Sequence, residues 1–134
     1  MEDGKWQMEG RNAATRKVAD IPARSFEFGV RIIRLCRHLD SRPGTPRTLA
    51  SQLLRSGTSV GANVEEGQAA HSRADFIAKY TIALKEARET LYRLRLLAAG
   101  GLVTAKRIAA LITEANELCR MLASAILTAR KSQK

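Results

Sequence analysis

Apolar side chains recur at steps of three and four along most of this chain of 134 residues, and this spacing is typical of amphipathic helices. The clearest run extends from residue 76 to residue 98, over about six helical turns. Its members are Phe76, Tyr80, Ala83, Leu84, Ala87, Leu91, Leu94 and Ala98. Aromatic residues, which β-sheets favour, make up only 4% of the chain. We therefore expect an all-α protein.

Turn-forming residues divide the periodic part of the chain into four helices. Pro43 and Gly44 lie between the first two, and Gly100 with Gly101 ends the third. Hydroxyl side chains stand where N-caps are expected, at Ser25, Thr45, Ser72 and Thr104. The helices are expected at residues 25–39, 46–70, 73–99 and 104–130, within one domain of residues 25–131. Short turns between them predict an antiparallel, up-down-up-down four-helix bundle.

The chain before residue 25 lacks the periodicity of the rest. Residues 1–24 have no sustained period, and Ile21 with Pro22 indicates a break, so we expect a flexible leader and a short first helix.

In the third helix, Ile77, Ile82 and Leu97 are apolar but lie off the main stripe. Apolar residues beyond one stripe favour a second contact surface, most simply with another subunit.

Basic charge is the quantitative indication of function. Lys and Arg number 23 against 13 Asp and Glu, a formal charge of +10. A charge of about 2 to 8 suffices for the solubility of a small domain, so the excess favours binding to phosphate backbones over a merely solvated surface. The segment of residues 49–71 carries none of the excess, because its single Arg is outnumbered by two Glu.

Two groups of arginines are the candidates for phosphate contact. Arg31, Arg34 and Arg37 repeat at three-residue steps on the first helix and form the first choice. The second choice is on the third helix and comprises Arg88, Arg93 and Arg95. The spacing of the aromatic residues makes no exposed stacking platform, so contact with the backbone rather than with the bases is expected.

The second helix carries glycines, serines and a threonine in its interior, which weaken a helix. One interpretation is that small side chains let a neighbouring backbone approach. The other concerns a polar stripe on one face, serving either as a structural network or as a ligand site: Gln52, Arg55, Ser59, Asn63 and Glu66. The structural interpretation pairs Arg55 with Glu86 or Glu66 in a partly buried network. Replacing Arg55 by Ala should then destabilise the fold by a few kcal/mol.

Enzymatic chemistry finds little support in the sequence. The two histidines, His38 and His71, lie in different turns, and no Glu-x-x-His pair for a di-metal bundle occurs. Cys36 and Cys119 lie on apolar stripes, where a free Cys behaves as a small hydrophobic residue. We therefore expect no catalytic residue, no metal and no cofactor. No apolar run reaches the roughly 20 residues of a membrane span, and the acidic N-terminus does not resemble a signal peptide, so a cytoplasmic protein without membrane contact is expected.

Eleven positions at fixed spacing carry a family resemblance. A Gln-x-x-Arg segment is followed by Ser-Val-x-x-Asn-Val-x-Glu-Gly and then by a Ser and an Asp-Phe pair that open the next helix. The positions are Gln52, Arg55, Ser59, Val60, Asn63, Val64, Glu66, Gly67, Ser72, Asp75 and Phe76. In this pattern the chain resembles the four-helix bundle family named after the 23S rRNA intervening-sequence protein. Ser56, Gly57 and Glu65 depart from it, because the family usually has Ala there.

The resemblance implies a left-handed antiparallel bundle that assembles with itself as a ring, typically a homopentamer. The family is bacterial and its usual proposed activity is nucleic-acid binding, and a related set of basic bundle proteins serves the reverse transcriptase of diversity-generating retroelements. We therefore expect a non-enzymatic nucleic-acid-binding or accessory protein that contacts RNA or DNA without sequence preference. The alternatives are an oligomeric scaffold for a protein partner, such as a reverse transcriptase, and a small-molecule pocket around Asn63 and Glu66.

Overall fold

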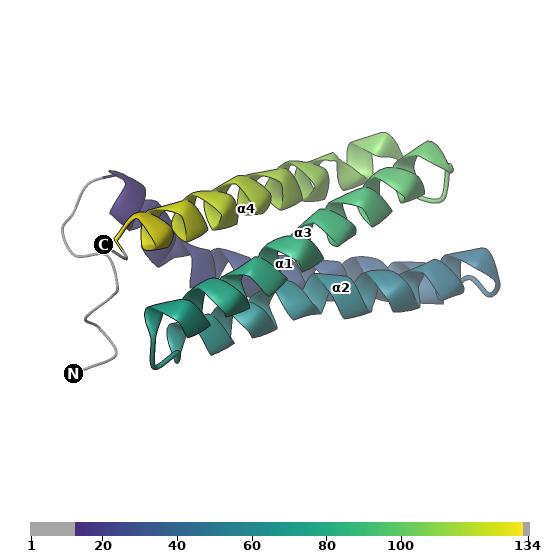
Figure 1. The fold of residues 1–134 in the computed structure, drawn as a ribbon. Helices are drawn as coiled ribbons and strands as arrows, with labels where there is room; N and C mark the ends of the chain where they lie inside the picture. The colour runs from purple at the N-terminus through teal and green to yellow at the C-terminus, as the bar shows by residue number, and fades with distance from the viewer. Residues whose placement is uncertain (1–12, 133–134) are drawn as a thin grey trace.

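Four helices follow one another along the chain in the computed structural model, which describes residues 13–132, with side chains from residue 20 onward. They are α1 (Ala13–Asp40), α2 (Thr45–Gln68), α3 (Arg73–Ala99) and α4 (Ala105–Lys131), and residues 13–132 contain no strand. Each helix packs against the next, and α1 also packs against α4, so α1 lies diagonal to α3 and α2 lies diagonal to α4. Figure 1 shows consecutive helices running in opposite directions, which confirms the predicted bundle.

The ends of α3 and α4 match the sequence signals closely. The Ser72 side chain accepts a hydrogen bond of 3.0 Å from the Asp75 N–H, and Thr104 caps α4 in the same way at 3.3 Å. Gly101 follows α3 with a φ of 77°, a left-handed conformation that glycine adopts without strain. The predicted cap of α2 is wrong by one position, because Thr45 is already helical and Gly44, with a φ of 91°, precedes it as the N-cap.

The start of α1 is the main departure from the predicted fold. The helix begins at Ala13 rather than near Ser25, and with 28 residues it is not short. Ser25 does not cap a helix: it is buried within α1, and its hydroxyl donates to the Pro22 carbonyl at 3.2 Å. Ile21 is fully buried in the core, and this packing offsets the backbone hydrogen bond that Pro22 cannot donate. Residues 1–12 of the expected leader lie outside the described residues.

The core consists of two apolar clusters placed end to end along the bundle. One cluster joins the beginning of α1 with the end of α4 and is centred on Tyr80 and Leu122. The other surrounds Phe28 and Leu118. In α2 and α3 a buried polar pair stands between the apolar residues of the two clusters, where the Thr90 hydroxyl lies 2.9 Å from that of Ser56.

The glycines of α2 are sites of close helix packing, as one interpretation of the sequence predicted. A Cβ atom added at Gly57 would lie 2.8 Å from Ile32 of α1, and one at Gly61 would lie 3.3 Å from the Ser25 carbonyl oxygen. At Gly67 the added atom would lie 2.6 Å from the ring of Tyr80 in α3. These approaches explain how α2 tolerates residues that weaken an isolated helix.

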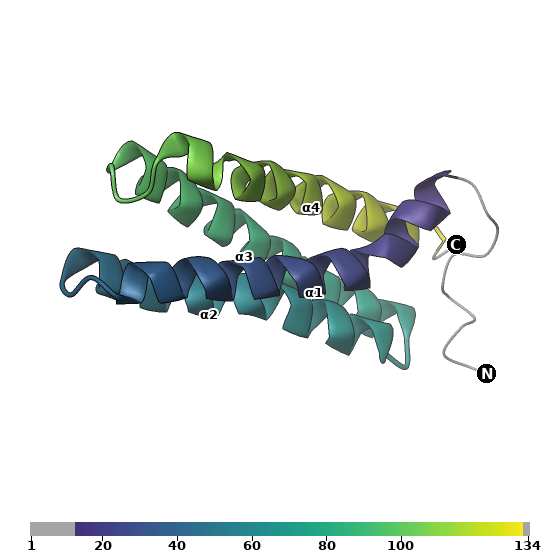
Figure 2. The same ribbon diagram turned by 180° about the vertical axis from the view of Figure 1, so that it is seen from behind.

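The contact between α1 and α4 is the least extensive of the four. Figures 1 and 2 show the two helices moving apart toward the end of the bundle where α1 finishes and α4 starts. Arg24 and Glu114 join them part-way along by two hydrogen bonds, of 2.7 and 3.0 Å. At the open end, the Arg42 guanidinium donates to the Leu102 carbonyl at 2.6 Å.

Candidate nucleic-acid interface

A groove of about 280 Å³ lies between α1 and α4 and gathers arginines from both helices. We call it the α1–α4 groove; its lining residues are Arg31, Arg34, Leu35, Arg107, Ile108 and Leu111. The three apolar residues, Leu35, Ile108 and Leu111, are buried, whereas Arg34 and Arg107 are exposed. The groove is therefore an apolar floor with guanidinium groups at its margins.

The arginines of the α1–α4 groove differ from their neighbour Arg24 in their charge environment. Glu114 neutralises Arg24, and their hydrogen bonds raise the pKa of the Arg24 guanidinium. Within residues 20–132, no carboxylate forms an ion pair with Arg31, Arg34 or Arg107. Their positive charge is therefore available to an external anion.

The predicted ridge of Arg31, Arg34 and Arg37 is divided between two sides of α1. Arg37 does not line the α1–α4 groove. It follows Val30 and Ile33 at steps of seven and four residues, so it shares their face of α1. Val30 and Ile33 line a hollow between α1 and α2, so this face points away from α4. Two of the three first-choice arginines thus share a site, and the third stands apart.

The predicted group on α3 also separates. Arg93 donates a hydrogen bond of 2.7 Å to the Glu89 carboxylate and another of 2.7 Å to the Gln52 amide oxygen. It is therefore occupied within the protein and makes a poor phosphate contact. Arg88 and Arg95 are exposed and form no ion pair with another described residue.

Four of the six arginines predicted from the sequence flank α4. Arg31 and Arg34 lie on its α1 side, and Arg88 lies on its α3 side. Burial raises the pKa of the half-buried Cys119 thiol in α4, and the nearby charge of Arg88 offsets part of this rise. Arg95 is seven residues beyond Arg88 and so lies near the same line on α3. One side of the bundle, centred on α4, thus carries positive charge.

The opposite situation holds where α2 meets α3. Arg55 pairs with Glu86 and Glu89, and Arg93 pairs with Glu89 at 2.7 Å. We call this set, completed by Gln52, the α2–α3 network. Hydrogen bonds from Arg93, together with the charge of Arg55, hold the pKa of the Glu89 carboxyl below its usual value.

The polar stripe of α2 is largely occupied by contacts within the protein. Gln52 and Arg55 reach α3, whereas the Ser59 hydroxyl donates to the Arg55 carbonyl at 2.6 Å and the Asn63 amide donates to the Ser59 carbonyl at 2.9 Å. Glu66 is exposed and is not the partner of Arg55. The Arg55 side chain is 55% exposed, so its replacement should cost about 1 kcal/mol, less than the few kcal/mol expected of a partly buried network.

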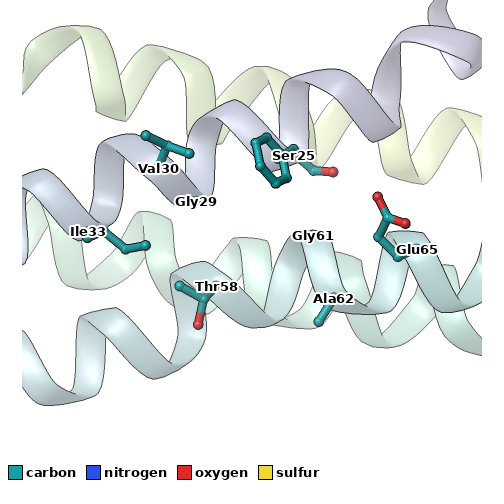
Figure 3. Close-up of a pocket in the computed structure, with 9 residues that line it drawn as sticks. Ser25, Gly29, Val30, Ile33, Thr58, Gly61, Ala62 and Glu65 are labelled. Atoms are coloured by element: carbon teal, nitrogen blue, oxygen red, sulfur yellow. The ribbon is translucent and has the colours of Figure 1, made fainter.

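A second, larger hollow lies between α1 and α2 on the outside of the bundle. Its volume is about 540 Å³, and we call it the α1–α2 groove. Figure 3 shows its α1 and α2 walls, with the Glu65 carboxylate toward one end. It is lined by Ser25, Phe26, Gly29, Val30, Ile33, Thr58, Gly61, Ala62 and Glu65. Two of the apolar lining residues, Phe26 and Ile33 of α1, are 67% and 43% exposed.

Exposed apolar side chains also gather on the outer face of α3. Of the three residues noted off the main stripe, Leu97 is buried and Ile77 packs against the core, but Ile82 is 41% exposed. Tyr92 and Leu96, at 56% and 42%, share the face of Ile82 at helical spacing. The outer face of α3 therefore carries exposed apolar side chains, and two of the three residues that the sequence suggested for it are not among them.

The cysteines and the one buried tyrosine belong to the core. Burial raises the pKa of the Cys36 thiol to about 11 and that of the Tyr80 hydroxyl to about 12, so neither ionises near neutral pH. Tyr80 accepts a hydrogen bond of 2.7 Å from the Gln68 amide.

Among residues 20–132, no three His, Cys, Asp or Glu side chains are grouped to hold a metal ion. None of the helices in the described range has an apolar stretch long enough to cross a bilayer.

Arg107 is the basic residue that the sequence interpretation missed. It lies seven residues before Glu114, just as Arg24 lies seven residues before Arg31. In an antiparallel pair, the register that joins Arg24 to Glu114 also brings Arg31 to Arg107. The only signal was this equal spacing, and it becomes informative once the register is known.

Comparisons with known proteins agree with the family resemblance. The family model described as 23S rRNA-intervening sequence protein matches residues 18–124. A solved structure from Bacteroides thetaiotaomicron, described as a protein with unknown function from the S23 ribosomal protein family, has 40% sequence identity and a TM-score of 0.74. The match covers 82% of this chain and 97% of that chain. A comparison with curated proteins found no match.

Proposed function

The chain belongs to the family of 23S rRNA-intervening sequence proteins, and from this premise we propose that it binds nucleic-acid backbones as a non-enzymatic or accessory protein. The proposal covers RNA and DNA alike, because phosphate is common to both. It assigns the contact to the basic side of the bundle centred on α4.

One observation carries the proposal: arginines on three helices lack an acidic partner among the described residues while those of the α2–α3 network are neutralised. The five are Arg31, Arg34, Arg88, Arg95 and Arg107. The planar guanidinium matches phosphate oxygens in pairs, which makes Arg suited to this contact. The exposed rings of Phe26 and Tyr92 lie on diagonal helices and cannot stack successive bases, so binding without sequence preference is expected.

The test is binding to a labelled structured RNA and to a DNA duplex across a salt series, with the mass determined on the same sample. We expect the logarithm of the affinity to fall linearly with that of the salt concentration, by about 0.7 to 0.9 for each phosphate contact. Replacing Arg31 and Arg34 together by Gln should weaken binding about tenfold or more and reduce this slope by about 2.

The control is a double variant with the same loss of formal charge, Arg55→Gln with Arg93→Gln. Both side chains are already paired within the α2–α3 network, so affinity should change by no more than about twofold. If the wild-type protein fails to bind either nucleic acid at the lowest salt, the proposed function is wrong and the charge serves solubility.

We also propose that copies of the chain assemble with one another, as the ring implied by the family requires. The α1–α2 groove and the exposed face of α3 are different apolar surfaces on different sides of the bundle. Two unlike surfaces that meet form a head-to-tail contact, which closes into a ring when the rotation allows. A pentamer is the number implied by the family resemblance.

Self-assembly and the alternative scaffold function are separated by mass measurements on two variants. Ile33→Glu in the α1–α2 groove and Leu96→Glu on α3 should each reduce the mass toward that of one chain. If Leu96→Glu leaves the assembly intact, the apolar face of α3 is free for another protein, and the scaffold for a partner such as a reverse transcriptase becomes the better proposal.

A further inference from the structure

We infer that the α1–α4 groove seats a phosphate group of a nucleic-acid backbone, held by Arg107 of α4 together with Arg31 and Arg34 of α1. This inference rests on the proposed function and narrows it to one site. It adds a residue from a second helix and excludes Arg37, which does not line the groove.

The first argument is the uncompensated charge of the groove. Three guanidinium groups line a space of about 280 Å³, and none of them forms an ion pair in the described part of the chain. Like charges this close repel each other, more strongly for the half-buried Arg31 than for fully solvated groups. A bound anion would convert this repulsion into charge-assisted hydrogen bonds.

The second argument is the placement of Arg107 in the first turn of α4. Helix dipoles favour acidic residues at this end, yet the first turn of α4 contains no acid and contains both Lys106 and Arg107. The positive end of the dipole therefore adds to the charge of the arginines. This arrangement is unfavourable for the isolated helix and favourable for an anion in the groove.

The third argument concerns which phosphate the groove can hold. Its floor consists of Leu35, Ile108 and Leu111, which offer no hydrogen bonds. A free phosphate ion would leave its inward oxygens unsatisfied against this floor. A phosphodiester can turn its charged oxygens toward the guanidinium groups at the margins and lay the apolar edge of its sugar on the floor.

The test compares two single variants of α4 in the RNA-binding assay. Arg107→Gln should weaken binding about 5- to 10-fold and reduce the salt slope by about 1. Arg130→Gln is the matched control, because Arg130 is also exposed on α4 and loses the same charge but lies far along the helix from the groove. It should change affinity by no more than about twofold, and Arg37→Gln should behave in the same way.

A double variant tests whether the arginines share one phosphate. When Arg31→Gln is combined with Arg107→Gln, the loss should be smaller than the product of the two separate losses, since removing either residue already disrupts the seat. If wild-type protein binds RNA but Arg107→Gln matches Arg130→Gln, the seat is wrong and the wider proposal stands. If wild-type protein does not bind, the proposed function itself fails.

Inorganic phosphate distinguishes a backbone from a free ion. At equal ionic strength, phosphate should displace the labelled RNA no better than chloride does. Phosphate-specific displacement that Arg107→Gln abolishes would overturn the selectivity for a phosphodiester, because the free ion and the RNA would then share the groove.

Discussion

The α2–α3 and α1–α4 interfaces of this bundle both hold arginines but treat most of them in opposite ways. At the α2–α3 interface, Arg55 and Arg93 converge on Glu89, and the helices approach closely enough that only a glycine fits beside Tyr80. At the α1–α4 interface the helices diverge (Figure 2), and beyond the Arg24–Glu114 pair arginines of both helices line the same groove.

The difference indicates where basic residues are paired within the fold and where they are left for a ligand. A basic residue paired with a carboxylate stabilises the fold modestly and is unavailable to a ligand. A basic residue left beside others of its kind adds nothing to stability and raises the local potential for anions. Function is therefore expected at the α1–α4 interface, although the family signature lies mostly on α2.

The largest expected effect tests the close packing of the α2–α3 interface. Replacing Gly67 by Ala places a Cβ atom 2.6 Å from the Tyr80 ring, so the ring or the helix must move. We expect a loss of about 2 kcal/mol in the free energy of unfolding, measured by urea titration.

Gly29→Ala is the control for this prediction, because nothing lies within 4 Å of the Cβ it would add. Gly29 lines the α1–α2 groove, so both substitutions are made in the background of Ile33→Glu, which removes the proposed assembly contact. In that background Gly29→Ala should stabilise the protein by about 0.5 to 1 kcal/mol through helix propensity. Equal effects of the two substitutions would show that α2 and α3 are not in close contact at Gly67.

The sequence was sufficient for elements whose signals are local. The caps Ser72 and Thr104 act within one turn, and the bounds predicted for α3, residues 73–99, agree with the structure. The beginning of α1 was mispredicted, because Pro22 is a local signal against helix whereas the burial of Ile21 depends on partners far along the chain.

The candidate site was predicted only in part, since it depends on the register between helices. Three-residue spacing suggested a ridge of Arg31, Arg34 and Arg37, but steps of three drift around a helix, so the ridge is split. Glu89, four residues before Arg93, was a partner that the spacing within α3 could have indicated, whereas the contact of Arg93 with Gln52 spans 41 residues. Arg107 gained significance only beside Arg31. Tertiary pairing of this kind leaves no trace in the spacing within one helix.

A smaller effect is expected from two of the ion pairs that join helices, and it sharpens the comparison between the interfaces. Arg24 and Glu114 make two parallel hydrogen bonds with side chains that are 37% and 19% exposed. A double-mutant cycle with Arg24→Gln and Glu114→Gln should give a coupling of about 1 kcal/mol. The more exposed Arg55, treated in the same way with Glu89→Gln, should give about 0.5 kcal/mol.

The ranking of these couplings matters more than their size. The α1–α4 contact is the least extensive of the four helix contacts in the described residues, so the Arg24–Glu114 pair should have the larger role in positioning the two helices. A stronger coupling for Arg55 with Glu89 would mean that the α2–α3 network fixes the bundle electrostatically as well as by packing.

The smallest expected effect is the pH dependence contributed by Glu89. Its pKa is lower in the folded protein than in the unfolded chain, because Arg93 and Arg55 favour the carboxylate. Its contribution to stability is therefore complete above the unfolded value of about 4.3 and is lost as the pH falls through the lower folded value. Between pH 6 and pH 3, urea midpoints of the wild-type protein should fall further than those of Glu89→Gln, by the equivalent of about 0.5 kcal/mol. The other carboxyl groups titrate in both proteins and cancel in this difference. Equal losses would mean that the arginines of the α2–α3 network do not stabilise the Glu89 carboxylate in solution, and the contrast with the α1–α4 interface would then rest on packing alone.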